Sequence, residues 1–157
     1  MIEYRSGCLI KALKSGEVNV IGHQANCFNT MGSGVAKAIR EVFPEAYEAD
    51  CQTDRGDKEK LGGLTVAVNQ YGMIFNLYGQ YDYGRDPTRV YTQLDALYNA
   101  LRSMHEILKM CGYQGNIGFP KLGCGLGGAK WEQVEAVIEG IFTNEDMHVV
   151  VYEKEVV

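Results

Sequence analysis

Residues 120–131 read PKLGCGLGGAKW, with glycine at positions 123, 125, 127 and 128. Residues 116–120 just before are typical of a short strand, and residues 131–142 after it have the apolar spacing of an amphipathic helix. A glycine-rich turn from a strand into a helix lets main-chain N–H groups approach an anion, and the helix dipole adds positive charge there. The same run also fits a tight connection that binds nothing. We call it the second glycine loop.

A similar arrangement occurs nearer the start of the chain, in what we call the first glycine loop. Residues 23–34 read HQANCFNTMGSG. They separate an apolar, β-branched segment at residues 18–22 from a helical pattern at residues 33–43. Because ligands of open α/β sheets bind at the carboxyl ends of strands, we expect the two loops to face one crevice and hold a diphosphate. Neither loop has the pattern of a P-loop or of a dinucleotide-binding turn.

The rest of the chain alternates between strand and helix patterns. Two short strand patterns lie close enough together to predict a hairpin, and an apolar stripe predicts one long helix beginning at residue 88 or 89. The expected elements are an edge strand at 2–5, a helix at 45–52, strands at 64–69 and 73–78, a loop at 79–88, the helix to 109 and a last strand at 148–152. The alternation predicts a three-layer α/β/α fold with a mixed, mostly parallel central sheet.

Composition narrows the classes of function. The chain has 157 residues and a formal net charge of −5, a length that favours one domain spanning residues 1–157. No broad basic field is present to hold duplex nucleic acid. The sequence has no apolar run of membrane-spanning length, and its first residues do not resemble a signal peptide. Five scattered cysteines are typical of reduced thiols in a cytoplasmic protein. We expect no metal and no cofactor, and the sequence leaves the oligomeric state open.

Together these segments resemble a macrodomain, the ADP-ribose-binding module. Residues 23–26 (HQAN) stand where the family often has Asn-Ala-Ala-Asn, and residues 31–36 (MGSGVA) resemble its Gly-Gly-Gly-Val-Ala turn. The second glycine loop resembles the second phosphate loop of the family, and residues 150–152 resemble its last strand. The resemblance covers essentially the whole chain in family order.

The resemblance implies a ligand site for ADP-ribose or ADP-ribose 1''-phosphate. In the first glycine loop and the helix after it, Gly32, Ser33, Gly34 and Val35 would border the distal ribose and the diphosphate. In the second, the residues that would wrap the diphosphate are Pro120, Gly123, Cys124, Gly125, Leu126, Gly127 and Gly128. Cys8 stands where many members have an Asp that reads the adenine amine. Main-chain groups near Leu9 or stacking by Tyr152 would then take over that role, or adenine recognition would be weaker. Tyr152 is equally compatible with a half-buried strand aromatic.

Departures from the family pattern narrow the subclass. One hydrolase branch has an Asp where this chain has Ala36. Another uses a Lys after the middle strand and an Asp in the second loop, at places that look like Gly79-Gln80 and Gly127 here. Residues 23–27 (HQANC) instead resemble the His-x-x-Asn-Cys of the small ADP-ribose 1''-phosphate phosphatases. The resemblance therefore implies a phosphatase. A non-catalytic reader of ADP-ribose, or a hydrolase that removes ADP-ribose from protein or nucleic acid, is the alternative.

Three side chains are candidates for catalysis. An imidazole titrates near neutrality, so His23 would act as general base, general acid or nucleophile. Asn26 and Asn29 would hold ribose hydroxyls or orient a water, and Asp82 is a carboxylate that would orient His23. The alternatives are a strand-end histidine without a chemical role and asparagines that cap their loop. Cys27 and Cys124 have no basic neighbour in the sequence, so buried small side chains are the better interpretation of both.

Overall fold

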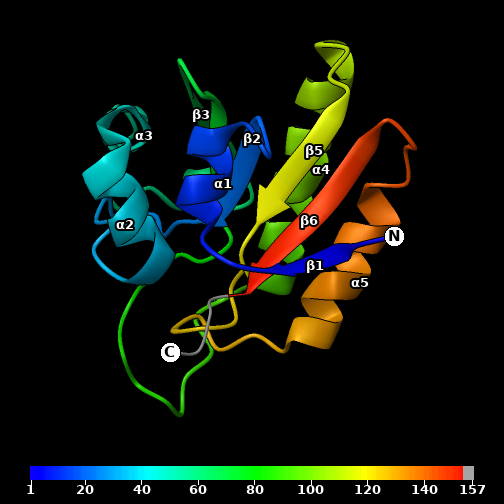
Figure 1. Ribbon diagram of the computed structural model, residues 1–157. Coiled ribbons are helices and arrows are strands. Elements are labelled where there is room, and N and C mark those ends of the chain that lie inside the picture. The colour runs from blue at the N-terminus through cyan, green and yellow to red at the C-terminus, as the bar shows by residue number, and fades with distance from the viewer. Residues whose placement is uncertain (154–157) are drawn as a thin grey trace.

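The computed structural model describes residues 1–153, so the last four residues of the predicted 1–157 domain lie outside the described part. Six strands form one sheet in the order β1-β6-β5-β2-β4-β3 (Figure 1). The strands are β1 (Glu3–Ser6), β2 (Val20–Gln24), β3 (Leu64–Asn69), β4 (Gly72–Leu77), β5 (Gly115–Phe119) and β6 (Met147–Glu153). The helices are α1 (Leu9–Ser15), α2 (Gly34–Val42), α3 (Pro44–Cys51), α4 (Leu94–Met110) and α5 (Trp131–Ile141), with a 3₁₀ turn at Lys58–Lys60.

The sheet is mixed and mostly parallel, as the alternation predicts. β1, β6, β5, β2 and β4 pair in parallel. Only β3 runs antiparallel, paired with β4 along its whole length from Leu64 opposite Leu77 to Asn69 opposite Gly72. The predicted hairpin is therefore confirmed. Because five strands share one direction, the C-terminal ends of β2, β5 and β6 lie at the same end of the sheet.

Helices cover both faces of the sheet, and alternate residues along one strand belong to different cores. On β6, Val149 and Val151 pack in the core under α4 and α5, whereas Val150 and Tyr152 pack in the core under α1, α2 and α3. This period-two alternation is what a strand buried on both faces requires. The three-layer α/β/α prediction is confirmed.

The prediction for the long helix differs from the structure at its start. The helix begins at Leu94, not at residue 88 or 89, and Val90, which falls within the predicted first turn, is 61% exposed. The main-chain N–H groups of Tyr91 and Thr92 donate to Gly127 O, and that of Gln93 donates to Gly79 O. These tertiary hydrogen bonds hold the segment extended, because an N–H group that donates to another loop is not available to a helical turn.

A further helix, α1, was not predicted from the sequence. Its buried side chains are Leu9, Ala12 and Leu13, which lie on one helical face, and Gly16 ends it in the left-handed region at φ 81°.

No helix among residues 1–153 has the length and hydropathy needed to cross a membrane.

Candidate functional site

A cleft of about 1060 Å³ lies where β2, β5 and β6 end. Both glycine loops line it, together with part of the loop after β4 and the end of β6. Its lining residues include His23–Asn26, Thr30–Ala36, Gln80, Tyr83–Arg85, Pro120–Gly127, Tyr152 and Glu153. The two loops that the sequence analysis paired do border one cavity. Of the predicted ligand residues, Gly32, Ser33, Gly34 and Val35 line it from the first side, and Pro120, Gly123, Cys124, Gly125, Leu126 and Gly127 from the second.

Main-chain N–H groups without a partner come from both sides of this cleft. Among residues 1–153, the N–H groups of Gly125, Leu126 and Gly127 donate to no other protein group. The same holds for the N–H groups of Gly34, Val35 and Ala36 at the start of α2, whose N-cap residue Ser33 makes no side-chain cap. Helix N-termini and glycine-rich turns with free N–H groups bind anions. The cleft therefore offers donors to a polyanion from two directions.

His23 lies at the floor of the cleft and is 1% exposed. Its Nε2 lies 2.6 Å from Asn76 Oδ1 on the neighbouring strand β4. Since Asn76 Nδ2 donates to Ala46 O and Thr65 Oγ1, the amide oxygen must face the imidazole, and Nε2 carries the proton. Nδ1 is then a buried acceptor without a protein partner.

Burial also sets the charge of this imidazole. It lowers the pKa of His23 to about 4, against the opposing effects of Asn76 and the Gln24 backbone. At neutral pH the ring is uncharged, so it accepts a hydrogen bond at Nδ1 and does not act as an acid there. Asn76, not Asp82, is the residue that orients it. Asp82 pairs instead with Arg89, at 3.3 Å between Oδ2 and Nη2.

The two predicted asparagines lie differently. Asn26 lines the cleft, but its Oδ1 accepts from Phe28 N and its Nδ2 donates to Thr30 Oγ1. Asn29 is not among the cleft-lining residues: its Nδ2 donates to Thr53 O, and its Oδ1 accepts from Lys60 Nζ at 2.5 Å. The geometry thus gives Asn29 a role in bracing the loop, whereas Asn26 both caps the loop and lines the cleft.

Lys60, which the sequence analysis did not single out, braces the first glycine loop. Its ammonium group donates to Cys27 O and Asp54 O as well as to Asn29. No local pattern marks it, because it lies on a 3₁₀ turn about thirty residues from the loop it holds.

The glycines of the second glycine loop serve different purposes. A side chain on Gly123 would bring its Cβ to 2.7 Å from Thr92 Oγ1, and one on Gly127 would overlap the same oxygen. Gly125 has open space around it. Gly128, at φ +79°, does not line the cleft and lies against the main chain of residues 89–90. Two of the predicted phosphate-loop glycines are thus required by a neighbouring segment of the protein.

A smaller cavity of about 230 Å³ adjoins the cleft at Tyr152, which lines both. Cys8 lines this smaller cavity, and Leu9 is buried in the apolar core. Tyr152 is 6% exposed, and its hydroxyl donates to Glu17 Oε2 at 2.5 Å. Burial and this carboxylate raise the pKa of Tyr152. The ring of Tyr152 therefore lies between the two cavities, and the hydrogen bond to Glu17 holds it there.

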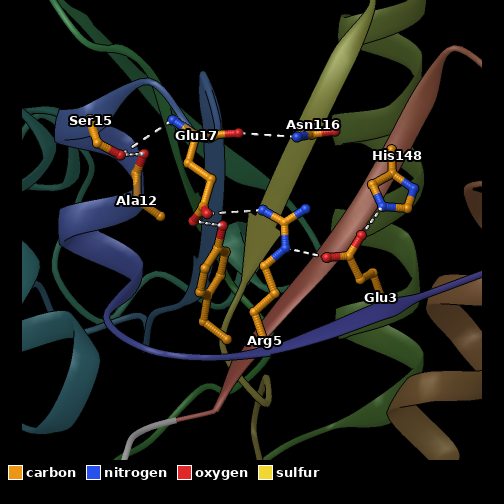
Figure 2. A network of polar contacts seen from close by, with 8 residues as sticks. Glu3, Arg5, Ala12, Ser15, Glu17, Asn116 and His148 are labelled. Atoms are coloured by element: carbon orange, nitrogen blue, oxygen red, sulfur yellow. Dashed lines mark hydrogen bonds and ion pairs between the residues drawn. The ribbon is translucent and has the colours of Figure 1, made fainter.

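A network of ion pairs next to Tyr152 joins Glu17 to residues of β1 and β6. Arg5 pairs with Glu17 at 3.0 Å and also with Glu3, which accepts from His148 (Figure 2). The hydrogen bonds from Arg5 and His148 lower the pKa of Glu3 to about 2. The network fixes Glu17, and Glu17 in turn holds the Tyr152 hydroxyl.

The two cysteines near the cleft are poor nucleophiles. Burial raises the pKa of Cys27 to about 11 and also raises that of Cys124. Both thiols are therefore protonated at neutral pH, which agrees with their interpretation as small packing residues.

The loop after β4 reaches over the cleft. Arg85 Nη2 donates to Ser33 Oγ at 3.3 Å, so this loop touches the start of α2. Phe28 of the first glycine loop packs edge-on against Tyr81 and Tyr83. At the other side of the mouth, Lys121 Nζ pairs with Glu153 Oε1 at 3.1 Å. Arg85 and Lys121 are the cationic side chains that line the cleft within residues 1–153.

This fold and this cleft are those of a macrodomain. Residues 23–138 match the family model described as Macro domain, and the chain belongs to that family. A 17.5 kDa protein of Enterobacteria phage T4, from the tk-vs intergenic region and uncharacterized, is 33% identical over 144 residues, covering 88% of both chains. The ADP-ribose 1''-phosphate phosphatase of Scheffersomyces stipitis is 28% identical over 162 residues, covering 88% of this chain and 94% of that one.

Other relatives are glycohydrolases. The DNA ADP-ribosyl glycohydrolase of Mycobacterium tuberculosis is 30% identical over 160 residues, which cover 97% of this chain and 42% of that one. Among solved structures, the macrodomain of Thermus aquaticus DarG has a TM-score of 0.76 at 24% identity and covers 98% of each chain. This structural likeness shows the fold.

Proposed function

We propose that this chain binds ADP-ribose in the cleft and hydrolyses ADP-ribose 1''-phosphate to ADP-ribose and phosphate. The observation that carries the proposal is that one cavity is lined by unpaired main-chain N–H groups of the second glycine loop and of the start of α2. Such groups stabilise the negative charge of a diphosphate without a metal-binding motif. The phosphatase relative, aligned over almost its whole length, supports the choice of reaction.

In this reaction water attacks the phosphorus atom and the bond from phosphorus to the ribose oxygen breaks, with the proton of water passing to the departing oxygen. Most of the catalysis in such a transfer comes from positioning and charge stabilisation. The unpartnered Nδ1 of His23 is a buried acceptor at the cleft floor. We assign it the role of holding a water or a ribose hydroxyl, and its neutral form is the active one. Asn26 would present its amide to the same region.

The proposal is tested by incubating the protein separately with ADP-ribose 1''-phosphate and with mono-ADP-ribosylated DNA or protein, and following both by phosphorus NMR. We expect inorganic phosphate from the first substrate only. His23→Ala should abolish turnover while ADP-ribose still binds by calorimetry. Because binding stabilises the folded state, ADP-ribose at 100 times its Kd should add about 2.7 kcal/mol to the free energy of unfolding.

One observation favours a second function, removal of ADP-ribose from DNA. The relative from M. tuberculosis that carries that name aligns with 97% of this chain. Against it, the resemblance puts Gly79-Gln80 and Gly127 at the places where one hydrolase branch uses Lys and Asp. Release of ADP-ribose from modified DNA without phosphate release would favour this function. Binding with no product from any of these substrates would make the chain a reader.

A further inference from the structure

A chain of hydrogen bonds along one side of the cleft, which Gln24, Gln80 and Gly123 line, links the end of β2 to the second glycine loop. Gln24, the last residue of β2, donates through Nε2 to Thr92 Oγ1 at 2.9 Å and to Gln80 Oε1 at 2.8 Å. The Thr92 hydroxyl donates onward to Gly123 O at 2.8 Å. Each group has a defined direction, because the Thr92 hydroxyl has one proton and Gly123 O can only accept.

Thr92 also fixes the far side of the same loop. The N–H groups of Tyr91 and Thr92 both donate to Gly127 O, at 2.8 Å and 3.0 Å. Gly123 O in addition accepts from Ala129 N at 2.9 Å, which closes the loop on itself. The three free N–H groups of Gly125–Gly127 lie between these two anchored carbonyls along the chain. The orientation of these N–H groups therefore depends on the position of Thr92.

The packing around the Gln24 amide is tight. A Cβ on Gly79 would overlap Gln24 Oε1, and one on Gly123 would come within 3.1 Å of it. Thr92 is 8% exposed, and Gln24 Oε1 is a buried acceptor without a protein partner. A buried, directional polar chain of this kind holds its members in one arrangement.

We propose that Gln24 and Thr92 are positioning residues that aim the N–H groups of the second glycine loop at the ligand's phosphates. Neither side chain donates to the anion. They fix the carbonyls of Gly123 and Gly127, which leaves the intervening N–H groups turned toward the cleft. This inference rests on the proposed function for the identity of the ligand, but its mechanical part, the ordering of the loop by Thr92, does not.

The sharpest test compares Thr92→Ala with Thr92→Ser, because the two variants differ only in the hydroxyl. Thr92→Ala should weaken ADP-ribose binding about tenfold, the effect of one lost hydrogen bond, while Thr92→Ser stays within about twofold of the unaltered protein. Gln24→Met, which keeps the length of the side chain and removes the amide, should weaken binding by a similar factor. Thr143→Val, an exposed threonine after α5, is the matched control.

Two further measurements distinguish a positioning role of Gln24 and Thr92 from a merely structural role. Amide hydrogen exchange of residues 123–128 should accelerate in Thr92→Ala and Gln24→Met but not in Thr92→Ser. The double variant Gln24→Met/Thr92→Ala should bind little worse than either single variant, because both break one chain of bonds. Unchanged loop exchange in Thr92→Ala, or independent losses that multiply in the double variant, would overturn the proposal. If the unaltered protein fails to bind ADP-ribose, the proposed function falls, and the exchange experiment still decides whether Thr92 orders the loop.

Discussion

The two glycine loops face the same cleft, but the protein holds them in different ways. In the first, Asn29 and Met31 adopt positive φ angles of 56° and 39° although neither is glycine. Long polar side chains from elsewhere brace it, among them Lys60, Tyr47 and Arg40. In the second, glycines pack against Thr92, the main-chain N–H groups of residues 91–92 donate to Gly127 O, and the Thr92 hydroxyl donates to Gly123 O. The first loop therefore depends on charge and side-chain reach, and the second on close contact.

This difference predicts opposite sensitivities. A loop held by close contact tolerates no added atom at its contact points, but it is insensitive to charge. A loop braced by an ammonium group tolerates added bulk but should loosen when the charge is removed. Substitutions of each kind can be made in both loops, and each result either sharpens the contrast or removes it.

The largest effect is expected from Gly127→Ala. The new methyl group would overlap Thr92 Oγ1 and lie 2.5 Å from Gly123 O, so the loop or residues 91–92 must move. We expect a loss of about 3 kcal/mol in the free energy of unfolding, measured by urea denaturation. Gly125→Ala, in the same loop with open space around it, should change stability by less than about 0.5 kcal/mol. Equal losses in the two variants would show that contact with Thr92 does not hold the loop.

Lys60→Met tests the bracing of the first loop. The substitution removes a half-buried cation that donates to three oxygens, and we expect a loss of between about 2 and 3 kcal/mol. Hydrogen exchange should accelerate at residues 26–31 and stay unchanged at residues 123–128. Lys109→Met, at the exposed end of α4, is the control and should cost less than about 0.5 kcal/mol. Faster exchange in both loops would show that they are one mechanical unit.

The pH dependence of the free energy of unfolding reports on the protonation of His23, which lies at the floor of the cleft that both loops line. The pKa of His23 is about 4 in the folded protein against 6.5 ordinarily, so between these values the unfolded chain binds a proton that the folded chain does not. Stability should therefore fall as the pH drops below 6.5, and His23 should account for about 2 kcal/mol of the loss by pH 5.

Between pH 7 and pH 5, the free energy of unfolding of His23→Gln, measured in urea titrations, should fall by about 2 kcal/mol less than that of the unaltered protein. Burial raises the pKa of Asp50, whose contribution has the opposite sign because its folded form holds the proton more tightly. Asp50 is present in both proteins, so its contribution cancels in the comparison. An identical pH dependence of the two proteins would place the His23 imidazole in contact with solvent.

The sequence predicted the sheet and both loops because their signals are local. Apolar runs between glycine turns mark β2 and β5 at short range. The start of α4 was misplaced because Tyr91 and Thr92 donate to a loop about thirty-five residues away, and no local pattern reveals that partner. Lys60 and Asn76 were missed for the same reason. α1 did carry a local signal, the spacing of Leu9, Ala12 and Leu13 before Gly16, but its short length hid it.

The smallest effect, from Asn26→Ala, decides what the cleft-facing asparagine of the first loop does. Its side chain satisfies Phe28 N and Thr30 Oγ1, so its loss should cost about 1 kcal/mol of stability through the cap alone. If Asn26 also contacts the ligand, as we propose, the Kd for ADP-ribose measured by calorimetry should rise at least about tenfold. Asn69→Ala is the matched control, because Asn69 caps the β3–β4 turn through Tyr71 N far from the cleft. A loss of stability with an unchanged Kd would make Asn26 a loop cap only, and both loops would then bind the ligand through their main chain.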